Sequence, residues 1–574
     1  MAVISTIEAR CKDCYKCLRS CPVKAIRFVG GVSKSDLHAK VMPERCILDG
    51  TCLLQCPQNA KKVRLEKDAA KALLHSGNQV VVSLAPSFAG VFLRERQGRV
   101  VSAIRRLGFD RVEETAFAAG GVAAEHVRAL DCVESPVITS SCPVVVNLVE
   151  MYYPEVMAHL APVVSPMVAH ARYLKAVTPG AAVVFIGPCV AKKDEAERGG
   201  DVDAALTFAE LSEWLHEDGI EMESLEESAP DGPGPVAARL FPIDGGLLRT
   251  AAMSTDVLSE EFRVISGVEN CMQFLDRLRA NHAAGNRLRI VEMLACTGGC
   301  VSGPGVRGCL PVVEASDRRQ AIIEFYRAHA ADERPAPAPV SIDLSRCHKE
   351  RTPALAAPDE VTIRGILAQT GKLTPEDELN CGACGYGSCR DKAVAVFHGF
   401  ADLQMCMPFM RERAESLSNV VLGSTPNGVV VVDRSLNVVD MNRAAEAMFG
   451  CLRQKMAGKA LAEMIDPENF ERVLEGKKML KLRVDYPQYS ISTEQSIFYV
   501  EKENVVIGIF VDRTEEQKRK SEAFQTRQSV ISRAQEVIDK QMKVAQEIAG
   551  LLGETTAETK ILLTKLMELM KKDE

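Results

Sequence analysis

Cysteine is the residue type in this sequence with the most capacity for chemistry, and the chain has twenty cysteines among its 574 residues. The segment CKDCYKCLRSCP spaces four of them as C-x2-C-x2-C-x3-C-P, at Cys11, Cys14, Cys17 and Cys21. Three closely spaced thiolates can bind three irons of one 4Fe–4S cluster, while the fourth, set apart and followed by proline, reaches a neighbouring cluster. The spacing therefore predicts a pair of iron–sulfur clusters near the N-terminus.

A second run, CILDGTCLLQCP, has the same spacing except that Asp49 stands at a cysteine position. Together the two runs resemble a two-cluster bacterial ferredoxin. We assign the first cluster to Cys11, Cys14, Cys17 and Cys56, and the second to Cys21, Cys46, Cys52 and either Asp49 or a water. A carboxylate is a harder ligand than a thiolate, so we expect a labile iron there and exchange with a three-iron form. The alternatives are a zinc site for the segment and a solvated turn for Asp49.

A third cysteine group lies in LNCGACGYGSCRDKAVAVFHGFADLQMCMP, with ligand candidates Cys381, Cys384, Cys389 and Cys406. The C-x2-C-x4-C-x16-C spacing resembles the small 4Fe–4S domain of some electron-transport and corrinoid-protein subunits. Zinc is the alternative metal, because four thiolates also suit a structural zinc site.

Three more motifs lie between residues 78 and 330, where strand-like runs such as AAVVFIGP alternate with amphipathic helices. They are TSSCP with Cys142, GPCVAKKDEA with Cys189, and EMLACTGGCVSGPG with Cys296 and Cys300. A lone cysteine in such a setting is most often a core residue. In this order after a two-cluster segment, however, the motifs resemble the catalytic domain of FeFe hydrogenases, as do stretches 107–119 and 244–251.

This resemblance implies an H-cluster, a 4Fe–4S cubane joined to a diiron unit that carries CO, cyanide and an azadithiolate bridge. Matched motif by motif, the cubane ligands are Cys142, Cys189, Cys296 and Cys300, with Cys300 also bridging to the diiron unit. Lys192 matches the family lysine that hydrogen-bonds a cyanide, and Glu195 completes that motif. A buried lysine needs such an anionic partner, because desolvation otherwise lowers its pKa.

Several departures from the family pattern bear on proton transfer. Ser141 stands where the family has the cysteine that shuttles protons to the diiron bridge, and a hydroxyl is a far weaker acid than a thiol. The positions that match the rest of the family's proton path are His126, Ala129 and Ala161. Other departures are Val145 for Trp, Gly187 and Leu294 for methionines, and Pro304 within the glycine run. Since lost acid–base groups cost about 10²–10⁴-fold in rate, we expect slow H2 chemistry.

The C-terminal region resembles a signalling module. STPNGVVVVDRSLNVVDMNRAAEAMFG, with Asn442 and Phe449 at characteristic places, resembles the start of a PAS domain, and NVVIGIFVDRTEEQKRK resembles its last strand and exit helix. No histidine follows His398, so we expect neither a haem ligand nor a kinase phosphoacceptor there. Residues 514–574 form an imperfect heptad pattern, which indicates a helix that dimerises or docks an effector, or a purely structural coiled coil.

Composition limits the other possibilities. Basic residues number 70 and acidic residues 77, a net charge of −7 that gives no general footprint for nucleic acid. We find neither a signal peptide nor an apolar run long enough to span a membrane, so we expect a cytoplasmic protein. Cysteines in that compartment favour metal ligation over disulfides. Five remain without a predicted role: Cys132, Cys271, Cys309, Cys347 and Cys451.

The predicted fold is a multidomain mixture of α/β and α+β parts. We expect a two-cluster ferredoxin-like domain (1–66), an FeFe-hydrogenase H-cluster domain (78–330), a linker (331–359), a 4Fe–4S domain (360–412), a PAS domain (415–513) and a signalling or dimerisation helix (514–574).

The leading hypothesis is an H2-sensing FeFe hydrogenase of low activity that signals through its clusters and PAS domain to a separate effector, as a homodimer. The alternatives are a metabolic hydrogenase that passes electrons to a redox partner, and a non-catalytic iron–sulfur scaffold protein.

Overall fold

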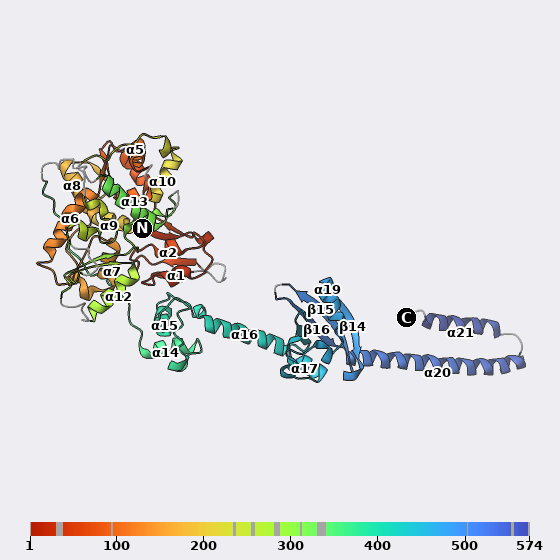
Figure 1. Cartoon of the computed structure of the whole chain (residues 1–574). Coiled ribbons are helices and arrows are strands. Elements are labelled where there is room, and N and C mark those ends of the chain that lie inside the picture. Colours follow the sequence, from red (N-terminus) through yellow and green to blue (C-terminus); the bar gives the residue numbers. More distant parts are fainter. Residues whose placement is uncertain are drawn as a thin grey trace. The chain divides into compact units, whose positions relative to one another are not determined.

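The structure is a computed structural model that describes residues 2–29, 38–92, 96–232, 237–253, 259–280, 287–309, 313–329, 340–501, 503–552 and 556–571. The chain divides into two compact units, Met1–Phe409 and Met410–Glu574. Figure 1 shows the order of their elements along the chain.

The N-terminal part of the first unit consists of two antiparallel strand pairs and two short helices. Strand β1 (Ile4–Thr6) pairs with β4 (Lys61–Val63), and β2 (Ile26–Val29) pairs with β3 (His38–Val41). Helices α1 (Lys16–Ser20) and α2 (Thr51–Gln55) each begin directly after a left-handed residue, Tyr15 and Gly50. Each helix carries one cysteine of a predicted cluster run, Cys17 in α1 and Cys52 in α2.

Two parallel sheets form the centre of the first unit. The first has the order β6 (Arg111–Glu114), β5 (Val80–Leu84), β8 (Ala182–Gly187), β9 (Ala204–Thr207), and the second β10 (Phe262–Ser266), β11 (Ile290–Leu294), β7 (Val137–Ile138). All residues of β5, β8 and β11 are buried, which explains their mostly apolar sequences, since parallel strands are covered on both faces; Ser83 and Glu292 are the polar exceptions in β5 and β11. The predicted α/β pattern of residues 78–330 is confirmed in this region.

One hydrophobic core lies around the first sheet, and a second core joins the second sheet to the N-terminal part. Leu18, Ile47 and Leu53 of the cysteine-rich segment pack in the same cluster as Val145 and Val291. The cysteine-rich segment is therefore not an independently packed domain, because it shares a hydrophobic core with the α/β part.

The predicted linker, residues 331–359, is described only from residue 340 onward, and residues 331–339 lie outside the described residues. From Val340 the chain runs extended over the α/β part. Ser345 pairs with Val163 as an antiparallel bridge, and the Val164 amide donates to Leu344 O at 2.9 Å. This half of the linker is thus docked rather than free, and it leads to α14 (Glu360–Ala368), which packs on α15 (Cys389–Phe397).

The second unit contains a five-stranded antiparallel sheet. Its order is β13 (Val438–Met441), β12 (Gly428–Val432), β16 (Val505–Asp512), β15 (Ile491–Val500), β14 (Leu480–Tyr486). Helices α17 (Arg443–Phe449), α18 (Arg453–Met456) and α19 (Glu468–Gly476) lie between β13 and β14 in the chain. Asn442 caps α17 by accepting the Ala445 amide at 2.9 Å, and it also accepts the Val429 amide at 2.8 Å.

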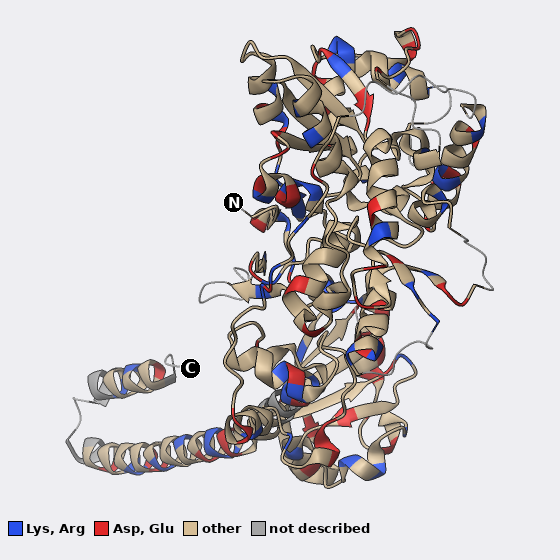
Figure 2. Cartoon of the chain, turned by 90° about the vertical axis from the view of Figure 1, so that its left-hand side faces the viewer, with Lys and Arg blue, Asp and Glu red and all other residues tan. Residues whose placement is uncertain are grey.

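Helix α16 (Met407–Ser424) precedes this sheet, and α20 (Thr514–Leu552) and α21 (Thr556–Lys571) follow it. The first turn of α20 is fixed to the sheet, because Asp512 accepts the Thr514 amide at 2.8 Å and Thr514 Oγ1 accepts the Ser492 amide at 2.9 Å. Figure 2 shows basic and acidic residues interspersed along α20. Among the described residues, no helix combines the length and the apolar character that a bilayer span requires.

Candidate functional site: a cysteine-lined cavity between two sheets

The central cavity lies where strands of both sheets reach their carboxyl ends. Cys142 follows β7, Cys189 follows β8 and Cys296 follows β11, while Pro86 and Thr115 follow β5 and β6. Ligands of open parallel sheets bind at this edge, because the loops there diverge. The cavity has a volume of about 100 Å³, and its lining includes Cys142, Cys189, Cys296 and Cys300. The structure thus brings together thiols that lie up to 158 positions apart in the sequence.

The cysteine thiols of this cavity are electrostatically coupled to one another. Burial, followed by the repulsion of neighbouring thiols, raises the pKa of Cys189 to about 11 and that of Cys300 to about 12. Cys296 is affected in the same way, with its pKa well above the ordinary value. Four thiolates this close together are costly without a cation between them, so the donor set fits a thiolate-bound iron–sulfur cluster.

Helix starts add a favourable field for an anionic group. Cys142 is the N-cap of α7 (Pro143–Tyr152), and Cys189 lies two residues before α9 (Ala191–Gly199). The first peptide N–H groups of a helix point outward and carry partial positive charge. Backbone N–H groups of Ala191 and Lys192 donate to the Cys189 thiol and lower its pKa against the effect of burial.

Lys192 is a charged side chain in the cavity wall. Its Nζ donates to Glu195 Oε2 at 2.7 Å, and both side chains are buried, with 11% and 4% of their surface exposed. Ser165 Oγ donates to the same oxygen at 3.0 Å. Burial alone would raise the pKa of Glu195, but Lys192, Arg346 and Ser165 outweigh it and hold that pKa below its usual range. The pair is therefore ionised, with the ammonium at the cavity.

Two serine hydroxyls in the cavity wall have no hydrogen-bond partner within the described chain. One is Ser141 Oγ, which the sequence singled out, and the other is Ser87 Oγ, whose residue is 1% exposed. A buried hydroxyl without a partner is costly, so both are free to meet a polar group bound in the cavity. Ser87 was not among the site residues predicted from the sequence. The feature that could have indicated it is its position in the segment APS, which directly follows the strand sequence VVVSL.

The structure shows what surrounds the residues at which this sequence departs from the family pattern. A side chain at Gly187 would meet the Phe185 ring at 2.6 Å, so Phe185, which lines the cavity, takes the space expected of the family methionine. Leu294 lines the cavity as well, while Val145 is a core residue at 1% exposure. Pro304 packs against Gly50 of the N-terminal segment, where an added Cβ would lie 2.4 Å from it.

The residues at the family's proton-path positions do not form a relay. His126 is fully buried: its Nδ1 is 2.8 Å from Val122 O, and its Nε2 accepts the Ser140 amide at 3.1 Å. Burial lowers the pKa of His126 to about 4, so the ring is neutral at physiological pH. Ala129 and Ala161 are buried methyl groups that carry no proton.

Two sets of N-terminal thiols are electrostatically coupled within themselves. Cys17 is coupled to Cys11 and Cys14, and burial, followed by those thiols, raises its pKa. Burial, with Asp49 as a further cause, raises the pKa of Cys21 to about 11 and that of Cys46 to about 12, and the same two causes raise the pKa of Cys52. Asp49 therefore lies among the thiols of the second group, although its Oδ2 also accepts from the Thr51 amide and hydroxyl. Cys56 is buried and accepts the Ala60 amide at 3.3 Å.

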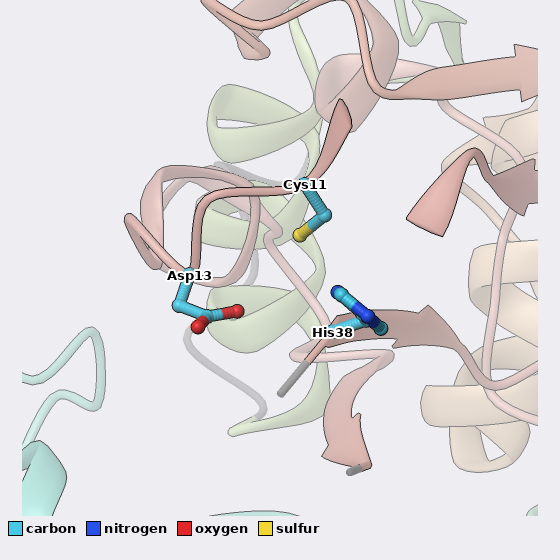
Figure 3. A group of neighbouring side chains, drawn as sticks. All are labelled: Cys11, Asp13 and His38. Atoms are coloured by element: carbon cyan, nitrogen blue, oxygen red, sulfur yellow. The ribbon is translucent and has the colours of Figure 1, made fainter. Parts of the chain in front are cut away.

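Asp13 and His38 stand beside Cys11, and Figure 3 shows the three side chains together. One donor atom from each lies within 4.8 Å of the others, and Asp13 Oδ1 and His38 Nδ1 have no hydrogen-bond partner in the described chain. Because the C-x2-C-x2-C run requires Cys11 for the first cluster, we treat Asp13 and His38 as polar neighbours of that cluster.

The third cysteine group lines a separate cavity of about 30 Å³. Its wall contains all four predicted ligands, Cys381, Cys384, Cys389 and Cys406, together with Lys372 and Lys392. Lys372 Nζ lies 3.4 Å from Cys406 Sγ, so a cation faces the thiols from the protein side. Tyr386 of this segment packs in the core shared with the N-terminal part, and Arg45 lies 5.0 Å from the ring centre of Phe400.

The remaining cysteines lie outside these groups. Cys271 and Cys309 are buried, Cys451 is half-buried beside Met464, and Cys132 and Cys347 are exposed.

The interior of the five-stranded sheet domain is filled by aromatic rings. Phe449 is 2% exposed and packs edge-on against Phe510, Tyr486 and Tyr489. A side chain at Gly508 would meet the Phe470 ring at 2.5 Å. Aromatic side chains therefore occupy this part of the interior of the domain.

Comparison with known families agrees with this arrangement. Residues 78–304 match the family "Iron only hydrogenase large subunit, C-terminal domain". Residues 10–60 match a 4Fe-4S dicluster domain, 377–408 an Fe-S cluster family and 422–480 the PAS fold.

Three curated relatives cover the hydrogenase part. Iron hydrogenase 1 of Clostridium pasteurianum is 26% identical over 390 residues, which are 56% of this chain and 67% of the relative. The periplasmic [Fe] hydrogenase large subunit of Nitratidesulfovibrio vulgaris is 27% identical over 54% of this chain and 88% of its own length. The NADP-reducing hydrogenase subunit HndD of Solidesulfovibrio fructosivorans is 26% identical over 52% and 63%. Residues 78–304 are therefore similar to the C-terminal domain of iron-only, or FeFe, hydrogenase large subunits, and this chain joins them to segments that match a dicluster domain, an Fe-S cluster family and the PAS fold.

Proposed function

We propose that this chain is a hydrogen-sensing FeFe hydrogenase, with slow reversible H2 chemistry in the central cavity and a redox signal passed through its iron–sulfur clusters to the PAS domain. The observation that carries this proposal is the cavity itself, in which thiols from three separate strand ends meet the ionised Lys192. The presence of a PAS segment on the same polypeptide supports sensing, since a catalyst that only supplies electrons needs none.

In this proposal Cys142, Cys189, Cys296 and Cys300, which line the cavity, would hold the cubane, and Cys300 would also be the ligand next to the diiron unit. When bound, that unit would supply the metal centre at which H2 is split or formed. Lys192 would donate a charge-assisted hydrogen bond to an anionic ligand of the unit, and Glu195, which pairs with Lys192, would keep the ammonium oriented. The apolar walls, including Phe185 and Leu294, exclude water.

Slow turnover follows from the groups that face the cavity. Ser141 Oγ holds its proton too tightly to act as an efficient acid at neutral pH. The positions matched to the rest of the proton path hold His126, which is neutral and hydrogen-bonded through both ring nitrogens, and the alanines Ala129 and Ala161. A missing acid–base chain costs about 10²–10⁴-fold in rate.

Further iron–sulfur clusters would carry electrons to and from the cavity. The ligands of the N-terminal clusters are Cys11, Cys14, Cys17, Cys21, Cys46, Asp49, Cys52 and Cys56, and those of the third group are Cys381, Cys384, Cys389 and Cys406. The partners are H2 and protons, together with an electron-transfer or signalling protein, in the cytoplasm.

A homodimer forms through the PAS domain and α20. On α20, Val530, Val537 and Val544 lie seven residues apart and are 55%, 58% and 53% exposed in the single chain.

The decisive experiment is infrared spectroscopy of protein carrying the matured diiron unit, under H2 and under argon, with H2 turnover measured on the same sample. We expect CO and cyanide bands that change under H2, together with low turnover. Turnover as fast as that of a bulk catalyst would favour a metabolic hydrogenase instead. Absence of the bands after maturation would leave only the non-catalytic scaffold.

A further inference from the structure

Residues 341–351, which we term the strap, connect the central cavity to the segment that carries the third cysteine group. Side chains of the strap alternate in exposure: Ile342, Leu344, Arg346 and His348 are partly buried, whereas Ser341, Asp343, Ser345 and Cys347 are exposed. This period of two is that of an extended strand with one face on the protein. The strap therefore has a defined inner face.

Backbone hydrogen bonds fix the strap at its middle and at its C-terminal end. The Arg346 amide donates to Pro162 O at 2.9 Å, and the Arg351 amide donates to Glu150 O at 2.8 Å. His348 Nε2 lies 2.8 Å from Ala161 O. Residues 161–164 lead directly to Ser165, which binds Glu195, and to Pro166, which lines the central cavity. The strap thus lies one layer behind the cavity wall.

Arg346 reaches from the strap to the lysine–glutamate pair. Its Nη1 lies 3.1 Å from Glu195 Oε1, the oxygen that Lys192 does not use, and its Nη2 lies 3.9 Å from Glu150 Oε1. The Arg346 side chain is 18% exposed, against 4% for Glu195 and 5% for Glu150. One carboxylate is therefore held from two sides, by an ammonium at the cavity and a guanidinium from the strap.

We propose that Arg346 is a positioning residue for the cavity, which fixes the Glu195 carboxylate and thereby aims the Lys192 ammonium at the bound group. The inference rests on the proposed function for the identity of that group, but the contact itself belongs to this chain. The ammonium of Lys192 and the guanidinium of Arg346 share the Glu195 carboxylate. A change in the anion that faces Lys192 therefore changes how strongly Lys192 binds this carboxylate, and with it how strongly Arg346 binds it. By linkage, docking of the strap and binding in the cavity then stabilise each other. A state change in the cavity thus has a physical path to the chain that enters α14.

Arg351 provides a matched control on the same strap. It binds Glu150 Oε2 at 2.8 Å and Asn147 Oδ1 at 2.6 Å instead of Glu195. Replacing either arginine by methionine removes one buried guanidinium from the strap and keeps similar bulk. Only Arg346→Met removes a contact with the Lys192–Glu195 pair, and Arg346→Lys keeps a cation within reach of it.

The test compares wild type, R346M, R346K and R351M as full-length protein. The first readout is hydrogen exchange of α9 (Ala191–Gly199) in protein that holds only its iron–sulfur clusters. We expect R346M to speed this exchange about tenfold or more, the effect of losing one charge-assisted hydrogen bond on a local opening equilibrium. R351M should speed exchange in the strap but leave α9 unchanged, and R346K should restore most of the protection.

The second readout is the infrared spectrum of the matured protein. R346M should shift and broaden the cyanide bands, R346K should restore them, and R351M should leave them as in wild type. Equal effects of R346M and R351M on α9 and on the bands, or no effect of R346M, would overturn the positioning role. If wild type itself gives no cyanide bands, the proposed function fails, while the exchange comparison still decides the role of Arg346.

Discussion

His126 occupies a position where a hydrogenase relay would place a proton carrier, yet its surroundings make it a fixed neutral ring. One ring nitrogen faces Val122 O at 2.8 Å and the other accepts the Ser140 amide at 3.1 Å. Ser140 lies two residues before Cys142, so the ring anchors the loop that carries this thiol. We predict that His126→Gln, which can donate and accept but never carries a charge, changes the acid stability of the protein more than its turnover.

The magnitude follows from the shift in proton affinity. Burial, with His348 as a further repulsive charge, lowers the pKa of His126 from 6.5 to about 4. Between these values the unfolded chain binds a proton that the folded chain does not, so stability falls as the pH falls. The full difference is about 3 kcal/mol, present above pH 6.5 and lost progressively down to pH 4. For a domain of this size it corresponds to roughly 5–10 °C in melting temperature.

The assay is anaerobic thermal unfolding of wild type and H126Q at a series of pH values from 7.5 to 4.5. Glu292, whose pKa burial raises to about 7, responds to pH in the opposite direction, but it is common to both proteins and cancels in the comparison. We expect the melting temperature of wild type to fall more steeply than that of H126Q. Parallel pH responses, combined with a tenfold or greater loss of H2 turnover in H126Q, would refute the structural role and restore His126 as a relay.

Three further perturbations test other parts of the site. Ser141→Cys should raise H2 turnover, by at most about 10²-fold because the next positions still lack acids, and unchanged turnover of matured S141C would show that this group does not limit the rate. Asp49→Cys should abolish the electron-paramagnetic-resonance signal of a three-iron cluster on oxidation, while Asp49→Ala should enhance it; equal signals in both variants would exclude Asp49 as an iron ligand. Val537→Glu should shift the protein toward monomer in sedimentation, whereas Ser532→Glu, which adds the same charge at an exposed position of α20, should not; a monomeric wild type would disprove the dimer.

The architecture was predictable where local spacing fixes geometry. The C-x2-C-x2-C-x3-C-P run, the strand-like run AAVVFIGP and the PAS signature each carry their structure within a short window, and the ferredoxin-like, α/β and PAS predictions are confirmed. The individual ligand assignments stay predictions, although the structure places the central thiols around one cavity and those of the third group around another.

What the sequence could not show depends on contacts between distant segments. Pro304 looked like an interruption of a glycine run, but its partner, Gly50, lies some 250 positions earlier. Phe185 lies two residues before Gly187 on β8, and its ring takes the space beside that glycine, a packing detail that no motif records. The predicted linker gave no sign of docking, since Arg346 and Arg351 find their carboxylates on α7 and α9 only in the folded chain. The prolines of PAPAP indicated a linker. The segment SIDLSRCH that follows alternates side chains of its inner and outer face, but it is too short for this pattern to predict a strand.

The polar network behind the cavity also bears on proton transfer. It runs from Lys192 through Glu195, Arg346 and Glu150 to His348, which lies 3.3 Å from Glu150 Oε1, and it has the continuity of a relay. Arginine, however, cannot release a proton in a protein, so transfer stops at Arg346. Glu150 is equally unsuited: burial opposes its charge, but His348 and the two strap arginines hold its pKa at about 2, far below any working pH. The network therefore fixes charges instead of moving them, as expected of a site whose occupancy is to be communicated to the rest of the chain.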